Sequence, residues 1–140
     1  MQSAAQIAPR GQTASVPKKL LWTGRIISTL CVLFLLFDAV IKLMKLPPVV
    51  EGTIRLGYPV SSIVGLGIVL LVSTLLYALP RTSVLGAILL TGYLGGATAT
   101  HVRVGAELFP ILFPGILGLL IWGGLYLRDE RLRALVPFRQ

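Results

Sequence analysis

The ionisable side chains best placed to do chemistry in this sequence lie at the ends of apolar runs. Asp38 and Lys42 lie in the stretch FLLFDAVIKLMK, residues 34–45, at the end of the first apolar run, and are four residues apart. This spacing places both side chains on one face of a helix, where a carboxylate and an ammonium group can pair. An ionisable group inside a membrane helix usually faces the bundle interior and has a partner. We therefore expect Asp38 to point inward and to pair with Lys42, or with Arg103 or His101.

Two further pairs of polar residues are expected near the same end of the molecule. Glu51 and Arg55 lie four residues apart after the first apolar run, and His101 and Arg103 follow the third. Together with the first pair they predict a polar pocket on the non-cytoplasmic side. His101 can change charge near neutral pH, and Arg103 can hold an anion. The alternative is that all six residues form ion pairs and headgroup contacts that fix the helix ends.

The sequence carries none of the usual enzyme or metal motifs. His101 is the only histidine and Cys31 the only cysteine, which excludes a bis-histidine haem, an internal disulfide and a thiolate metal cluster. No G-x-S-x-G, P-loop or dinucleotide fingerprint occurs. We therefore assign no catalytic residue and no metal ligand, and we favour a non-catalytic protein.

The composition indicates a chain surrounded by lipid. Of its 140 residues, 55% are hydrophobic and 13% are charged, about half the charged share of a soluble domain. Such a chain cannot cover its apolar side chains with its own polar surface in water, so the lipid bilayer is its expected partner. The net charge of +8 comes from basic residues beside the apolar runs. This pattern is typical of membrane topology, and we expect no nucleic acid partner.

Four apolar runs approach the roughly 20 residues that a membrane helix needs. We therefore predict an all-α integral membrane domain, a bundle of four transmembrane helices within residues 20–127, with spans at about 21–43, 62–79, 83–100 and 109–127. Residues 1–19 are expected to form a flexible tail. Residues 128–140 are expected to form a basic cytoplasmic tail, with a helix on anionic lipid. We expect the first run to be a span and not a cleaved signal peptide, because it is too long and no small-residue cleavage motif follows it.

The basic residues also predict the direction of the spans. With four spans, both tails and the loop at residues 80–83 share one side of the membrane. That side carries Arg10, Lys18, Lys19, Arg25, Arg81, Arg128, Arg131, Arg133 and Arg139, and the other side carries only Lys42, Lys45, Arg55 and Arg103. The positive-inside rule then places both termini in the cytoplasm.

Small residues recur every four positions in the third run. Gly92, Gly96 and Thr100 form one stripe of a helix, and a GxxxG spacing lets two membrane helices approach closely. We expect this stripe to pack inside the bundle. The alternative is a seam between two copies of the chain in a homodimer.

Four stretches resemble a known family. The sequence GAILLTGYLGGATATHVRVG, followed by LFPGILGLLIWGGLYLRDERLRALVP, is similar to the DoxX-like family of small four-helix bacterial membrane proteins. WTGRIISTLCVLFLLFDAVIKLMK and RLGYPVSSIVGLGIVLL resemble it too, so that the similarity covers residues 22–137. Its most specific part is the glycine-rich third run that ends in His101 and Arg103. The resemblance implies a multi-pass protein of the bacterial cytoplasmic (inner) membrane.

The resemblance also suggests a function. Some relatives are subunits of a thiosulfate–quinone oxidoreductase, and others belong to membrane complexes that handle oxidative stress. We therefore expect a non-catalytic accessory protein or subunit of a redox complex. No cofactor is required by the sequence, but a quinone can be accommodated, with Tyr93, His101 or Arg103 as hydrogen-bond donors. The single cysteine argues against a thiol relay of its own.

Two alternatives remain open for the function. One is a small four-helix transporter that uses Asp38, although Lys42 at the next helical turn would hold that carboxylate ionised. The other is a quinone-interacting oxidoreductase subunit. The substrate, the partner and the oligomeric state do not follow from the sequence.

Overall fold

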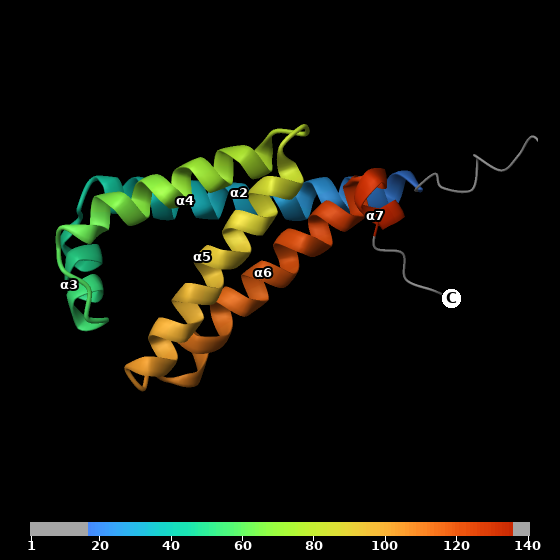
Figure 1. Ribbon diagram of the computed structural model, residues 1–140. Coiled ribbons are helices and arrows are strands. Elements are labelled where there is room, and N and C mark those ends of the chain that lie inside the picture. Colours follow the sequence, from blue (N-terminus) through green and yellow to red (C-terminus); the bar gives the residue numbers. More distant parts are fainter. Residues whose placement is uncertain (1–16, 136–140) are drawn as a thin grey trace, which may run out of the picture.

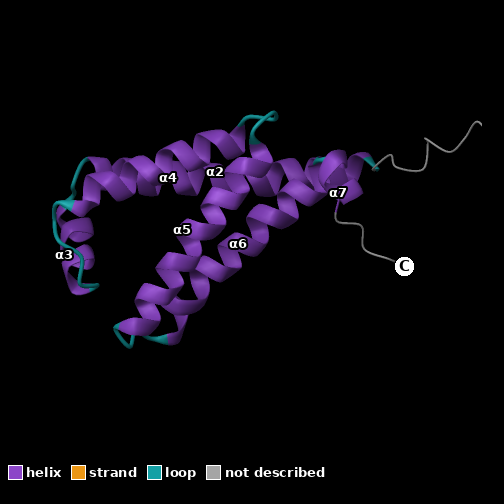
Figure 2. Cartoon of the chain, in the orientation of Figure 1, coloured by secondary structure: helices purple, strands orange, loops and turns teal. Residues whose placement is uncertain are grey.

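The structure is a computed structural model and describes residues 17–135. This part of the chain folds into helices α2 (Lys18–Leu43), α3 (Pro47–Arg55), α4 (Ser62–Ala78), α5 (Ser83–Arg103), α6 (Leu108–Arg128) and α7 (Glu130–Leu135). No strand occurs between residues 17 and 135, so the prediction of an all-α fold is confirmed (Figure 2). Residues 1–16 and 136–140, which include most of the predicted N-terminal tail, lie outside the described part.

By length and composition, α2, α5 and α6 can cross a membrane; they contain 26, 21 and 21 residues. Much of their apolar surface faces outward, as at Phe37 and Leu119, which are 65% and 74% exposed. Exposing so much apolar surface to water is unfavourable in free energy, so we infer that lipid covers it. α4 is also apolar but has only 17 residues, fewer than the roughly 20 expected for a span. Three of the four predicted spans are therefore supported, and the predicted span at residues 62–79, which corresponds to α4, remains a prediction.

The observed helices are slightly longer than the predicted runs, except α4. α2 begins at Lys18 instead of Leu21, and α5 continues to Arg103 instead of ending at Thr100. His101 and Arg103 therefore belong to the last turn of a helix and have helical neighbours. α6 runs through Pro114 without an interruption.

Two helical pairs form the molecule. α2 packs against α4 and α6, and α5 packs against α4 and α6. Figure 1 shows α2 with α4 as one arm and α5 with α6 as the other. The arms meet near the α4–α5 turn and α7, which we call the closed end, and diverge toward α3 and the α5–α6 turn, which we call the open end.

Glycines allow the close approach of helices at the closed end. A Cβ atom on Gly86 of α5 would lie 2.2 Å from the backbone nitrogen of Tyr77 of α4. A Cβ atom on Gly24 of α2 would lie 2.8 Å from the backbone oxygen of Gly124 of α6. Atoms do not approach so closely without displacement, so these positions accept only glycine in the present packing.

A chain of hydrogen bonds joins three helices at the same end. Arg128 Nε donates to Ser28 Oγ at 2.9 Å, and Ser28 Oγ lies 2.9 Å from the Tyr77 hydroxyl. That hydroxyl donates to the backbone oxygen of Ile121 at 2.7 Å. Tyr77 is completely buried, and a buried hydroxyl must have such partners to be tolerated. The network therefore holds α2, α4 and α6 together where the arms meet.

The small-residue stripe of α5, Gly92, Gly96 and Thr100, does not lie at the closed end. Among the described residues, no atom beyond the adjacent turns of α5 comes within 4 Å of a Cβ built on Gly92 or Gly96, so the expected close packing of these glycines inside the bundle is wrong. The reason is that the two arms diverge along this part of α5 (Figure 1). Thr100, the third member of the stripe, is 7% exposed and does pack inside the molecule.

Candidate functional site

The divergence of the arms leaves a cavity at the open end. Its volume is about 460 Å³, and residues of α2, α5 and α6, together with Leu66 of α4, form its walls. Thr53 of α3, with Leu56 and Tyr58 from the turn after it, also lines the cavity. Small-molecule sites typically measure roughly 300–1,000 Å³ and combine an apolar lining with a few polar groups. This cavity has both properties.

Apolar side chains form most of the wall on the α2 and α6 sides. Leu35 of α2 and Phe113, Pro114 and Leu117 of α6 line the cavity. The ring of Phe34 meets that of Phe113 edge to face, with 5.5 Å between the ring centroids, an arrangement favoured between aromatic rings. The two arms are thus in contact beside the cavity, although their backbones diverge.

The α5 wall combines small residues with larger side chains. Gly92, Gly96 and Ala97 line the cavity with backbone and one methyl group, and the other α5 residues in the lining are Tyr93, Leu94, Thr100 and His101. These residues recur at three- and four-residue spacing, so they share one face of the helix. The glycine stripe that suggested helix packing therefore provides the space of the cavity.

The ion pair that the sequence predicted lies in this cavity. Lys42 Nζ is 2.6 Å from Asp38 Oδ1, and the Lys42 and Asp38 side chains are 18% and 29% exposed. Both residues line the cavity. Of the three partners considered for Asp38, the structure therefore selects Lys42. Because an ammonium group has three N–H donors, Lys42 can serve a further acceptor while it holds the carboxylate.

His101 presents a second polar group to the cavity. Its Nδ1 lies 2.7 Å from the backbone oxygen of Ala97. A carbonyl oxygen only accepts, so Nδ1 carries the proton of this bond. Nε2 is then the ring atom left for a ligand, as an acceptor in neutral histidine and as a donor in the cation.

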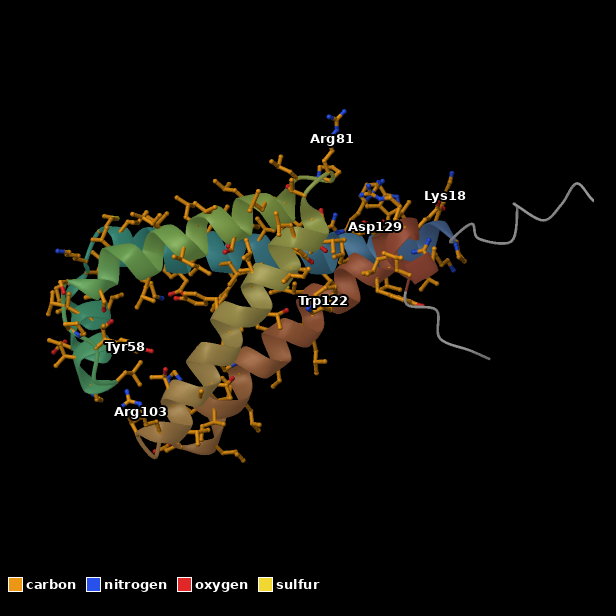
Figure 3. All side chains as sticks on the ribbon, viewed as in Figure 1. Lys18, Tyr58, Arg81, Arg103, Trp122 and Asp129 are labelled. Atoms are coloured by element: carbon orange, nitrogen blue, oxygen red, sulfur yellow. The ribbon has the colours of Figure 1, made fainter. Side chains whose placement is uncertain are left out.

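Arg103 does not join the Asp38 pair. Its Nη2 donates to the backbone oxygen of Leu56 at 2.7 Å, and the neighbouring Tyr58 hydroxyl lies 2.9 Å from Thr100 Oγ1. Figure 3 shows Arg103 and Tyr58 at the open end, one on each side of the gap between α5 and α3. These two bonds attach the turn after α3 to the end of α5. We call the segment 47–58, α3 and this turn, the strap.

Gly57 allows the strap to pass close to Arg103. Its φ angle is +93°, a region that residues with a side chain rarely adopt. A Cβ atom there would also lie 3.1 Å from Arg103 Nη2. Sequence reasoning did not identify Tyr58 as a site residue. The sequence RLGYP, residues 55–59, indicates a turn at this position, but it does not show which helix the turn contacts.

Glu51 and Arg55 are not brought into the site. Both are exposed on α3 and neither lines the cavity. Each lies two positions from Thr53, which faces the cavity, and two helical residues turn the side chain by about 200°. Among the described residues no ion pair joins Glu51 to Arg55. Of the six expected pocket residues, the structure thus brings Asp38, Lys42 and His101 together.

Apolar helices around a ligand-sized cavity define a class: small α-helical membrane proteins with a pocket between their helices. The chain belongs to the DoxX-like family, whose profile matches residues 26–124, more than half of the sequence. The expected family is therefore confirmed. The matched region includes Asp38, Lys42 and His101 and ends before α7. No curated protein and no solved structure matches the chain.

Proposed function

We propose that this protein is an accessory subunit of a redox complex in the bacterial cytoplasmic membrane and that its open-end cavity holds a quinone. The cavity is the observation that carries the proposal. It combines the apolar surface that a prenylated ring needs with several hydrogen-bonding groups. The sequence resemblance to DoxX-like proteins, some of which are subunits of a thiosulfate–quinone oxidoreductase, supports the same proposal.

The chemistry of the lining fits a quinone carbonyl. Such an oxygen accepts hydrogen bonds, and three side chains can donate: Lys42 through its free N–H groups, Tyr93 through its hydroxyl, and protonated His101 through Nε2. All three line the cavity. The ring and its apolar tail would lie against Leu35, Phe113 and the bare backbone of the glycine stripe.

The transporter alternative has less support. A proton-coupled carrier needs a carboxylate that gains and loses a proton during transport. Asp38 lies 2.6 Å from the ammonium group of Lys42, so its carboxylate already has a partner within the cavity. The pair suits a fixed polar anchor for a ligand.

The quinone proposal is tested by measuring what the protein carries out of the membrane. The full chain is excised in native lipid discs by an amphipathic polymer, and its quinone is quantified after extraction. We expect an enrichment over bulk membrane lipid of about tenfold, and its loss in the Tyr93→Phe, His101→Gln double variant. Quinone at the bulk lipid ratio would overturn the proposal. Tyr126→Phe, outside the cavity, is the control for a general effect of losing a hydroxyl.

The accessory role requires a second experiment. The protein is purified by affinity in mild detergent and the accompanying chains are identified by mass spectrometry. The proposal expects a flavin-, haem- or iron–sulfur-containing membrane oxidoreductase in near-equal amount. If the protein emerges alone, with bound quinone, the accessory role is wrong.

A further inference from the structure

A second cavity lies at the other end of α2. We call it the arginine groove; its volume is about 350 Å³, and Trp22, Arg25, Val32 and Leu33 of α2 line it with Ala78 of α4 and Arg128 of α6. The α2 residues recur at three- and four-residue spacing and share one helix face. The groove therefore runs along the surface of α2, with arginines at its closed-end part and aliphatic side chains farther along the helix.

Among residues 17–135, the two arginines of the groove have no acidic partner. The two acidic residues of the closed end, Asp129 and Glu130, lie near other arginines, at 3.5 Å from Arg131 and 4.0 Å from Arg133. Arg25 stacks on the Trp22 ring at 5.3 Å, which leaves its charge uncompensated. Within residues 17–135 no ion pair includes Arg25 or Arg128.

Arg128 keeps donors free for a ligand. Its Nε–H is used by Ser28 Oγ, and Nη2 makes a long contact of 3.4 Å with the backbone oxygen of Tyr77. A guanidinium has five N–H groups, so most of them have no acceptor in the described structure. The bond to Ser28 and the ring contact with Tyr77 at 5.1 Å also fix the guanidinium in place. A phosphate bound there would meet a preorganised donor.

The remainder of the groove has the character of a lipid contact. Leu33 is 58% exposed and the neighbouring Leu30 is 62% exposed on the same membrane helix. Trp22, 57% exposed, lies beside the arginines, and tryptophan is enriched at the level of lipid headgroups. The positive charge at the headgroup level suits the phosphate of an anionic phospholipid, and the aliphatic side chains farther along the groove suit its acyl chain. Basic pockets between membrane helices are known to bind such headgroups.

We propose that the arginine groove binds one anionic phospholipid. Its phosphate lies between Arg25 and Arg128, and an acyl chain runs along Val32 and Leu33. This site is independent of the quinone proposal, because the groove and the open-end cavity share no residue. The lipid would bridge α2 and α6 at the closed end and add to the bonds that hold the arms together there.

The test is native mass spectrometry of the full chain in mild detergent with added phosphatidylglycerol or phosphatidylcholine of equal chain length. We expect one phosphatidylglycerol to be retained in preference to phosphatidylcholine. Arg25→Gln should weaken this retention about fivefold, as expected for one basic residue at the headgroup level. The matched control is Arg81→Gln, which removes the same charge at the closed end from a side chain that extends away from the helices (Figure 3). This variant should retain the lipid as the unchanged protein does.

Three outcomes would overturn the proposal. Equal retention of both lipids would show that the groove does not distinguish an anionic headgroup from a zwitterionic one. Equal losses in Arg25→Gln and Arg81→Gln would show a diffuse charge effect without a site. Millimolar inorganic phosphate is added in a further arm. We expect no displacement of the lipid, whereas displacement by free phosphate would mean that the acyl chain contributes nothing and that the occupant is a small anion.

Discussion

At the scale of single residues, the pair of Asp38 and Lys42 is the feature that the sequence predicted best. The spacing of four residues within one helix determines their proximity, so no knowledge of the tertiary fold was needed. The partners of Arg103 and the positions of Glu51 and Arg55 were not predictable in this way. They depend on how α3 is rotated against α5, and that rotation follows from long-range contacts such as Tyr58 with Thr100.

The pair leads to a prediction for a double-mutant cycle. Asp38→Asn and Lys42→Gln should each destabilise the protein by about 1–2 kcal/mol, between the values of exposed and buried ion pairs. The double variant should lose clearly less than the sum, because neither charge is then left alone. Thermal or denaturant unfolding in detergent measures these differences. Combined with Arg103→Gln, the effect of Asp38→Asn should be additive; coupling to Arg103 and none to Lys42 would contradict the structure.

At the scale of helices, the glycines divide into two groups that the sequence does not distinguish. Gly86 and Gly24 occupy close helix contacts, whereas Gly92 and Gly96 form a cavity wall. The GxxxG spacing shows that two glycines share a helix face, but it does not show what that face meets. What the glycine face contacts depends on where the two arms diverge. That divergence is a property of the assembled bundle and cannot be deduced from the spacing of glycines.

The two groups should respond differently to an added methyl group. Gly86→Ala should destabilise the protein by about 1–3 kcal/mol, the usual cost of overpacking, because its Cβ would overlap the backbone of α4. Gly65→Ala is the matched control in an apolar helix, with no atom within 4 Å of its Cβ. It should be neutral or stabilising by up to about 1 kcal/mol. Equal unfolding temperatures for the two variants would contradict the packing described for the closed end.

The strap makes a separate prediction at the same scale. Arg103→Gln removes the bond to the backbone oxygen of Leu56, so the amides of residues 47–58 should exchange with deuterium faster. Arg55→Gln serves as the control, because that arginine is exposed on α3 and makes no ion pair among the described residues. Unchanged exchange in the strap of Arg103→Gln would mean that this bond does not fix it.

At the scale of the whole molecule, the sequence predicted the helical class, the membrane environment and the family. These follow from composition and from the lengths of apolar runs, which are local properties. It did not predict the shape of two diverging arms or the cavity between them. Shape depends on where helices touch, and apolar side chains that face lipid and those that face a neighbouring helix look alike in a sequence.

The direction of the molecule in the membrane is a prediction at this scale. Lys18, Arg25, Arg81 and Arg128 all lie at or near the closed end (Figure 3), so the positive-inside rule places that end in the cytoplasm. Reporter fusions after Gln140 and near Glu51 should give opposite signals, with the C-terminal fusion active in the cytoplasm. Equal signals would mean that α4 does not cross and that the chain has three spans.

The most direct test of the central claim is the affinity of the open-end cavity for a quinone. A short-tailed ubiquinone is titrated into the protein, Gly96→Leu and Gly95→Leu. Both glycines are in α5 with no atom within 4 Å of the Cβ position, but only Gly96 lines the cavity. The Gly96→Leu side chain would project into the cavity and occupy part of it, so Kd should rise about tenfold or more, equivalent to roughly 1.4 kcal/mol of lost binding energy. Gly95→Leu should bind like the unchanged protein. Equal affinities of all three proteins, or no saturable binding by any of them, would contradict the account.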